Sequence, residues 1–415
     1  MSEAGGAERS VFRHRGVTQF ICGRLGATVA TQMLSVVVGW QVYALSHDPL
    51  ALGFVGLVQF LPMALLILPA GNLADRFNRK HLLALSWAVQ AVASALFLVL
   101  TLTHHDKLLS FYGVLVLFGV ARAFAGPTMQ SFLPLLVPIE DLPRAIAWNS
   151  SAFQIAVIAG PALGGGAYIL GPDVAYAICF ALFLASIAAV LSIRGEREQM
   201  HDTLARSAFA RFTAGIAYVR DNPIILGAIS LDLFAVLFGG ATALLPVYAS
   251  TILHVGPVGL GALRSAMAVG AFVVGIYLGR RALGRHAGMA MFACVALFGV
   301  ATLVFGLSKS FPLSLVALGI AGGADMVSVF VRSTLVQLAT PDAMRGRVNA
   351  VNTLFIGTSN ELGEFESGVT ANWFGTVPAV VIGGIGTLAV VGLWMWRFPA
   401  LRRVDRLSDV RPNQS

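Results

Sequence analysis

The chain has 415 residues, of which 57% are hydrophobic and only 12% are charged, and its formal net charge is +8. A soluble domain carries about 25% charged residues, so this composition excludes an ordinary water-soluble globular protein. The basic residues are spread through short segments without an aromatic-basic platform, which argues against a nucleic-acid partner. The chain is therefore expected in a lipid bilayer, where about 20 apolar residues span the hydrocarbon core.

Apolar runs separated by short polar segments predict an all-α membrane protein with twelve transmembrane helices. In the first half they are expected at residues 17–46, 50–70, 82–103, 108–135, 145–170 and 173–193. In the second half they are expected at residues 223–252, 257–279, 287–308, 311–338, 349–372 and 377–397. The N-terminal stretch MSEAGGAERSVFRHRG lacks the apolar region of a cleaved signal peptide, so the first span is expected to act as the insertion signal.

Positive charges are distributed unevenly between the two sides that these spans define. With the N-terminus in the cytoplasm, 22 of the 28 Lys and Arg residues fall in cytoplasmic segments, two fall in outer loops and four lie within spans. This is the positive-inside pattern of membrane proteins. Both termini are therefore expected in the cytoplasm, and the chain is expected to be a multi-pass protein of a bacterial inner or plasma membrane.

The longest hydrophilic interval, 194–222, divides the chain into an N-terminal six-helix bundle (1–193) and a C-terminal bundle with a cytoplasmic tail (223–415). Apolar residues at helical spacing in this interval indicate either an amphipathic helix on the inner membrane face or a plain linker. These residues are Phe209, Phe212, Ile216 and Val219.

The two halves resemble each other in their fourth spans. GVARAFAGPTMQSFLPLLVPIEDLPRA begins at Gly119, and GIAGGADMVSVFVRSTLVQLATPDAMRG begins at Gly319. Both run from small residues through a polar stretch to a Pro-acid turn, which ends in Arg144 or Arg345. Duplicated six-helix halves with a substrate site between them near the membrane midplane are the architecture of many secondary transporters, so two pseudo-symmetric bundles are expected.

A charged segment, GNLADRFNRKHLL, lies between the second and third spans and is expected to form a tight cytoplasmic turn over residues 71–81. It resembles the loop motif of the major facilitator superfamily, although Asn78 stands where glycine is usual. The residues that carry the gating-loop motif are Gly71, Leu73, Asp75, Arg76, Arg79 and Lys80. The resemblance implies a latch in which Asp75 and Arg76 bridge to neighbouring helices. The alternative is an ordinary basic cytoplasmic loop.

A degenerate copy of this segment, GRRALGRHAG at 279–288, lies at the equivalent position of the second half and lacks the aspartate. The latch is therefore expected to be asymmetric between the halves.

Two further motifs agree with this family. Phe118, Arg122 and Gly126 in the fourth span resemble its l-x-x-x-R-x-x-q-G pattern, with Ala125 in place of glutamine. The fifth span contains a motif similar to the antiporter signature G-x8-G-x3-G-P-x-x-G-G, which is associated with exporters. Its matching residues are Gly160, Pro161, Gly164 and Gly165, with Ala147 and Ala156 at the upstream glycine positions. Ordinary tight helix packing is the alternative explanation.

Three stretches of the second half narrow the resemblance to the enterobactin-exporter-like branch, which also contains drug-efflux proteins. They are LDLFAVLFGGATALLPVYA at 231–249, RGRVNAVN at 345–352 and NELGEFESG at 360–368.

Charged residues inside the spans are few. A charge at the bilayer centre costs about 2.5–3.5 kcal/mol on insertion scales, so each is expected to face a cavity or a partner. All eight histidines lie at span ends or outside the spans, so proton coupling is expected to depend on carboxylates. The candidate proton or substrate site comprises Arg122, Asp232, Asp325, Glu361 and Glu364.

Each of these residues allows more than one role. Asp232 is expected either to face the central cavity as a proton site or to form a structural ion pair. Asp325 and Arg332 are too far apart along their helix to bond, so each is expected to find a partner on another helix.

Glu361 and Glu364 lie three residues apart, where their repulsion favours a proton on one of them; alternatively, Glu364 and Glu366 lie in water in an outer vestibule. Arg122 is expected to neutralise an acid, to bind an anionic substrate group or to be structural.

The resemblance implies a secondary transporter, and the expected function is proton-coupled export of small amphipathic molecules, siderophore-like or drug-like, by alternating access. An importer or a non-transporting sensor or scaffold with the same fold are the alternatives. None of the three lysines follows glycine, so the chain contains no Walker loop for binding ATP. Because no histidine lies inside the spans, an enzyme is not expected either.

No cofactor and no metal site is expected. Cys22, Cys179 and Cys294 fall in apolar runs and are expected to be small buried hydrophobes. The partners are expected to be the lipid bilayer, a small-molecule substrate and protons, and the protein is expected to be a monomer.

Overall fold

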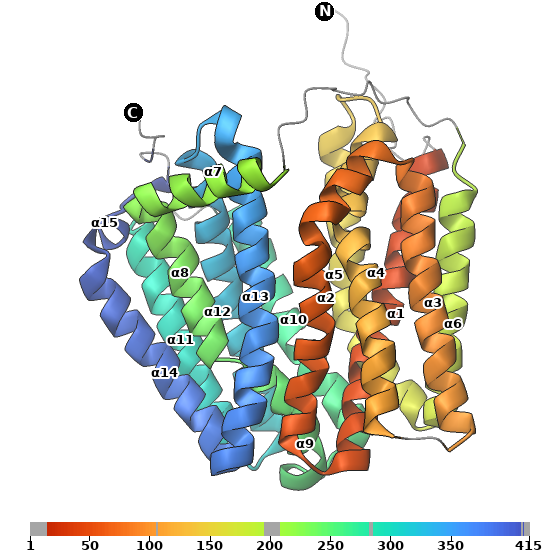
Figure 1. The fold of residues 1–415 in the computed structure, drawn as a ribbon. Coiled ribbons are helices and arrows are strands. Elements are labelled where there is room, and N and C mark those ends of the chain that lie inside the picture. The colour runs from red at the N-terminus through yellow and green to blue at the C-terminus, as the bar shows by residue number, and fades with distance from the viewer. Residues whose placement is uncertain (1–14, 105–106, 195–207, 282–284, 408–409, 411–415) are drawn as a thin grey trace, which may run out of the picture.

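The computed structural model describes residues 15–104, 107–194, 208–281, 285–407 and 410, and within this part of the chain the only regular elements are helices. Figure 1 shows two helix bundles side by side, one from each half of the chain, with α7 (Ala208–Asp221) lying across one end. The prediction of an all-α protein is therefore confirmed.

The first half contributes α1 (Arg15–Ser46), α2 (Pro49–Arg76), α3 (Arg79–Leu102), α4 (Leu108–Phe132), α5 (Leu142–Tyr168) and α6 (Pro172–Leu191). The second half contributes α8 (Pro223–Phe238), α9 (Leu245–Val247), α10 (Gly256–Arg280), α11 (Ala287–Leu307), α12 (Phe311–Leu338), α13 (Asp342–Phe374), α14 (Thr376–Arg397) and the short α15 (Pro399–Arg402). Short 3-10 helices lie at Leu133–Leu135 and Ala241–Leu244, and a π-helical turn lies at Tyr248–Ile252.

Eleven segments of the described chain are long and apolar enough to cross a bilayer. They coincide with the predicted spans except for α13, which has 33 residues but carries acidic side chains near its middle. The residues responsible are Glu361, Glu364 and Glu366.

Two predicted elements differ from the structure. Residues 71–76 are not part of a turn, because α2 continues through Arg76 and only Phe77 and Asn78 separate it from α3. The seventh predicted span, 223–252, is not one continuous helix. It is interrupted after Phe238, where Gly240 approaches Gly363 on α13 so closely that an added Cβ would lie 2.7 Å from the Gly363 carbonyl oxygen.

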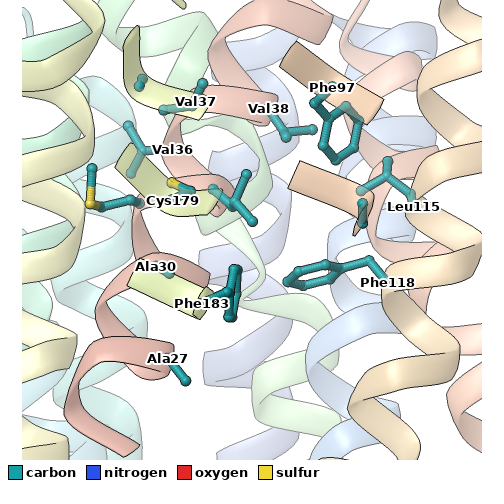
Figure 2. Close-up of a cluster of buried hydrophobic side chains, with 14 of the residues drawn as sticks. Ala27, Ala30, Val36, Val37, Val38, Phe97, Leu115, Phe118, Cys179 and Phe183 are labelled. Carbon is teal, nitrogen blue, oxygen red and sulfur yellow. The ribbon is translucent and has the colours of Figure 1, made fainter. Parts of the chain in front are cut away.

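The first bundle is held together by a core of small aliphatic and aromatic side chains from α1, α3, α4 and α6 (Figure 2). Phe97 stacks on Tyr176 with ring centroids 5.3 Å apart, and the Tyr176 hydroxyl donates to Gln41 Oε1 at 2.7 Å. Cys179 is buried in this core, whereas Cys22 is exposed on the surface of α1, contrary to the prediction.

The two halves meet through two helix pairs, α2 with α13 and α5 with α10. Gly53 and Gly368 bring the first pair together, because a Cβ added to Gly368 would lie 2.7 Å from the Gly53 Cα. Gly165 on α5 lies against the backbone of Pro257 on α10. The Asn372 side-chain amide donates to Asp48 Oδ1 at 3.2 Å. We call the end of the molecule that contains these contacts the Asp48 end; α7 lies at the opposite end (Figure 1).

Candidate functional site: a charged cavity between the two halves

A cavity of about 200 Å³ lies between the halves and is lined by α1, α2, α3 and α4 on one side and by residues of the second half on the other. Its apolar wall includes Phe97 and Phe118, and its neutral polar lining comes from Thr31, Gln32, Ser35 and Gln59. Four charged residues also line it, namely Arg122, Arg264, Glu361 and Glu364. The site therefore combines an apolar wall with two cations and two carboxylates.

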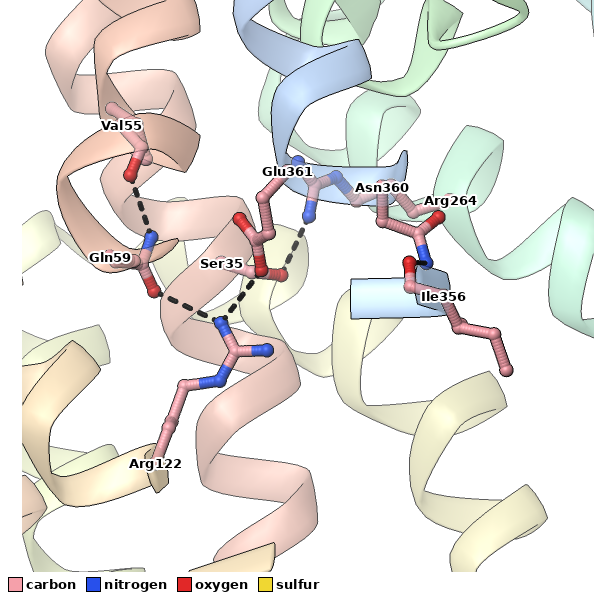
Figure 3. Close-up of polar contacts among 8 residues, drawn as sticks. All are labelled: Ser35, Val55, Gln59, Arg122, Arg264, Ile356, Asn360 and Glu361. Atoms are coloured by element: carbon pink, nitrogen blue, oxygen red, sulfur yellow. Dashed lines mark hydrogen bonds and ion pairs between the residues drawn. The ribbon is translucent and has the colours of Figure 1, made fainter. Parts of the chain in front are cut away.

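Arg122 and Glu361 form an ion pair across the two halves (Figure 3). Arg122 Nη1 lies 3.2 Å from Glu361 Oε1 and donates more weakly to Gln59 Oε1 at 3.5 Å. The Gln59 amide group donates to the Val55 carbonyl at 3.1 Å, which fixes the orientation of its oxygen toward Arg122. The Arg122 side chain is 36% exposed and that of Glu361 is 13% exposed, so both can be reached from the cavity.

Arg264 and Glu364 enter the same cavity from α10 and α13. Arg264 Nη1 donates to Ser35 Oγ on α1 at 2.7 Å, a second polar contact between the halves (Figure 3). Glu364 lies against α2, where Gly56 leaves room for it: a Cβ on Gly56 would lie 2.9 Å from Glu364 Oε2. The cavity thus contains contacts that can exist only while the two halves are in this relative position.

The other two members of the predicted site lie elsewhere. Asp232 on α8 forms a buried ion pair with Arg332 on α12, and neither residue is among those that line the cavity. Asp325, also on α12, is close enough to interact electrostatically with both. These three residues lie within the second bundle and do not line the cavity, whereas Arg122, Glu361 and Glu364 do.

The small-residue motif of α5 packs this helix between α1 and α10. Gly160 faces Gln32 and Gly164 faces Met33, and a Cβ on Gly164 would lie 2.9 Å from the Met33 Cα. Gly165 faces α10 through its contact with Pro257. The motif therefore lies where α5 meets both its own bundle and the opposite half.

The gating-loop motif is described only in part, since the surroundings of Gly71 and the side chains of Asp75 and Arg76 lie outside the described part of the chain. Arg79 donates to the Ser131 carbonyl at 3.1 Å, and Lys80 donates to the Ile193 carbonyl at 2.7 Å, so both cations bind helix ends of their own bundle. Leu73 accepts the Phe77 backbone N–H at the end of α2.

Asn78 has an ordinary negative φ of −59° and caps α3 by accepting the His81 backbone N–H at 3.3 Å. This position therefore needs a capping side chain and not the conformational freedom of glycine.

In the second half, a carboxylate from the C-terminal tail binds the degenerate copy of this motif. Asp405 accepts the His286 backbone N–H at 2.9 Å and contacts the His286 ring and Arg285. The backbone carbonyl of Asp405 accepts the N–H of Ala287 at 3.0 Å. The backbone N–H of His286, followed by the charge of Arg285, lowers the pKa of Asp405. The tail thus provides an acidic group at the loop that lacks its own aspartate.

Sequence reasoning passed over Arg264, Ser35 and Gln59 as site residues. Arg264 was recognisable as one of four arginines inside the spans, but nothing indicated which face of its helix points inward. Ser35 and Gln59 carry no charge, and such side chains are common in helices that pack against each other.

Comparisons with known proteins agree with this architecture. Enterobactin exporters named EntS from Citrobacter koseri and Shigella boydii are 24% and 23% identical to this chain, and each alignment covers 94% of this chain and 93% of the relative.

Among solved structures, a bacterial homologue of the iron transporter ferroportin in an inward-facing state superposes with a TM-score of 0.73 at 16% identity, covering 95% of this chain and all of that chain. A bacterial homologue of the human lysosomal transporter Spinster, also inward-facing, gives a TM-score of 0.72 at 14% identity over 95% and 96% of the two chains.

The family model of transmembrane secretion effectors matches residues 9–414. This chain is therefore a multi-pass bacterial membrane transporter, not an enzyme, and it belongs to the transmembrane secretion effector family of the major facilitator superfamily.

Proposed function

We propose that the protein is a monomeric, proton-coupled exporter of small amphipathic molecules that works by alternating access. The relatives named as exporters align with nearly the whole chain, and the cavity offers both an apolar wall and charged groups. In this proposal α13 is also a membrane span and brings the number of spans to twelve, since its acidic residues Glu361 and Glu364 face the cavity and are thereby kept from lipid. Both termini and α7 lie in the cytoplasm, in line with the positive-inside distribution.

With this orientation the structure corresponds to a state closed to the outside. In this proposal, the close contacts between the halves at the Asp48 end, including those of Gly53 with Gly368 and Gly165 with Pro257, close that side of the cavity. The solved relatives with similar folds that carry a state in their titles are inward-facing. Export would then require the two halves to separate at the Asp48 end and to close near α7.

The observation that carries the proposal is the Arg122–Glu361 ion pair, because its partners belong to opposite halves. A proton on Glu361 removes the charge that holds Arg122, so protonation and the relative position of the halves are coupled. After proton release to the cytoplasm, charged Glu361 holds Arg122 while the cavity takes substrate. After the change to the outward-facing state, protonation of Glu361 accompanies release of the substrate and permits the return.

The proposal is tested in inverted membrane vesicles with an acidic interior, which load substrates that the cell would export. Wild-type protein is expected to accumulate at least some members of a panel of fluorescent amphiphiles in a manner that depends on the pH gradient. Glu361→Gln should abolish this accumulation. Glu366→Gln is the matched control, since Glu366 lies on the same helix, accepts a hydrogen bond from Thr370 at 2.7 Å and does not line the cavity.

Gradient-driven accumulation that persists in Glu361→Gln would remove this residue from the coupling mechanism. Accumulation that ignores the pH gradient in the wild type would exclude the proton as coupling ion.

A further inference from the structure

Arg264 lines the cavity without an ion-pair partner among the described residues. Its Nη1 is bound to the neutral Ser35 hydroxyl, and its Nε is buried without a hydrogen-bond partner in the described part of the chain. A guanidinium presents five N–H donors in a planar fork that matches the two oxygens of a carboxylate. Apart from the Nη1–Ser35 contact, the Arg264 guanidinium therefore makes no hydrogen bond within the described residues.

Glu364 is the corresponding acceptor in the same cavity. Within the described residues it takes part in no hydrogen bond and no ion pair, whereas Glu361, one turn earlier on α13, is bound to Arg122. The charged groups that face Glu364 are Glu361, Arg264 from α10 and Arg122 from α4. From α2 the backbone at Gly56 lies next to it, since a Cβ added there would lie 2.9 Å from Glu364 Oε2.

The four charged residues of the cavity thus comprise one ion pair and two opposite charges that are not in contact with each other. Arg122 and Glu361 neutralise each other directly, while Arg264 and Glu364 line the cavity without reaching each other. Opposite charges that are held apart inside a protein cavity are costly to maintain without a partner. A ligand that carries both a negative and a positive group satisfies both residues at once.

We infer that Arg264 and Glu364 form a subsite for the polar head of an amphoteric substrate, a molecule with a carboxylate or similar acceptor and a protonated amine. The carboxylate binds Arg264, the ammonium group binds Glu364, and the apolar body lies against Phe97 and Phe118. This inference rests on the proposed function and names the substrate class that the transporter takes.

The subsite also explains why exchange against protons is suited to such a substrate. A proton on Glu364 removes the negative charge that the ammonium group needs, so proton and substrate compete for one carboxylate. Mutually exclusive binding is the requirement for antiport. A purely anionic ligand would bind only Arg264 and would not compete with the proton.

The inference is tested by binding to the purified, detergent-solubilised protein, which requires no transport. The probes are norfloxacin, which carries a carboxylate and a secondary amine, its ethyl ester, which keeps only the amine, and its N-acetyl derivative, which keeps only the carboxylate. Wild-type protein is expected to bind norfloxacin about tenfold more tightly than either derivative, the size of one charge-assisted hydrogen bond.

The variants are expected to give a crossed pattern. Glu364→Gln should weaken binding of norfloxacin and the ester but leave the N-acetyl derivative unaffected, and Arg264→Gln should weaken norfloxacin and the N-acetyl derivative but leave the ester unaffected. Glu366→Gln is the folding-matched control, and size-exclusion profiles exclude misfolded variants.

The inference is wrong if norfloxacin fails to bind, if it binds no more tightly than its derivatives, or if each variant weakens all three probes alike. If the crossed pattern appears while the vesicle experiment shows no gradient-driven accumulation, the subsite stands and the proposed coupling fails.

Discussion

Replacing Arg332 should destabilise the second half more than any surface substitution. Arg332 is paired with Asp232, and the two side chains are 2% and 6% exposed. The pair lies inside one bundle, between α12 and α8, and the charge of Arg332 also acts on Asp325. Arg332→Gln therefore leaves two acidic residues without their cation, whereas Asp232→Asn leaves Arg332 with Asp325 nearby.

The magnitude follows from these partners. Breaking a buried ion pair by removing one partner costs about 3–5 kcal/mol, because the remaining charge is left uncompensated. We expect Arg332→Gln at the upper end of this range and Asp232→Asn at the lower end. The double variant Asp232→Asn/Arg332→Gln should be more stable than the sum of the single effects predicts, with a coupling of about 2–3 kcal/mol.

The assay is unfolding of the purified protein by SDS in mixed micelles, followed by tryptophan fluorescence. Trp394 is one of the six tryptophans and lies near the pair, since its indole N–H donates to Ser230 at 2.9 Å, on the same helix as Asp232. Single variants that unfold at the wild-type SDS fraction, or a double-mutant cycle without coupling, would show that the pair does not support the bundle.

Three further predictions concern other parts of the molecule. Gly53→Leu should hold the Asp48 end open, because its Cβ would lie 3.2 Å from the Gly368 Cα. In an Asn372→Cys background, maleimide added from outside should then label the cysteine faster. Gly113→Leu is the control, because a Cβ there meets nothing within 4 Å, and it should leave the labelling rate unchanged. Asp405→Asn should increase proteolysis of the tail at neutral pH. The lowered pKa of Asp405 means that its contribution is present at neutral pH and is lost as the pH falls below about 4, so the difference from wild type should disappear there, and a difference independent of pH would contradict this role. Asn78→Ala should cost about 1 kcal/mol in the SDS assay through loss of the α3 cap, and Asn78→Gly only a few tenths; equal losses would argue against capping.

The predicted helices follow from the length and polarity of each segment, and most bounds agree with the structure within a few residues. The hydropathy of a segment does not predict where its helix is interrupted. The interruption after Phe238 depends on Gly240 meeting Gly363 on a helix more than a hundred residues away, and a long-range contact of this kind leaves no local pattern. The charged residues at 75–80 favour a turn in the sequence, but a helix that leaves the bilayer can carry charges on its last turn, and α2 continues to Arg76.

The candidate site was predictable in its residue types but not in its grouping. Depth within a span identified Arg122, Glu361, Asp232 and Asp325 as unusual, but depth does not say which face of a helix looks toward which neighbour. The sequence does not identify which acid Arg122 neutralises, because its partner Glu361 is 239 positions away along the chain. Only the packing of α2, α4 and α13 brings the two together.

The location of each ion pair relative to the two halves bears on its role. If the halves move as rigid bodies, residues of one bundle keep their distances throughout the cycle, and the Asp232–Arg332 pair remains intact in every state. The Arg122–Glu361 pair and the Arg264–Ser35 contact join opposite halves and must change when the halves rotate. A free-energy difference between states can come only from interactions that differ between them. The charges inside the second bundle are therefore expected to govern stability, whereas those between the bundles are expected to govern transport.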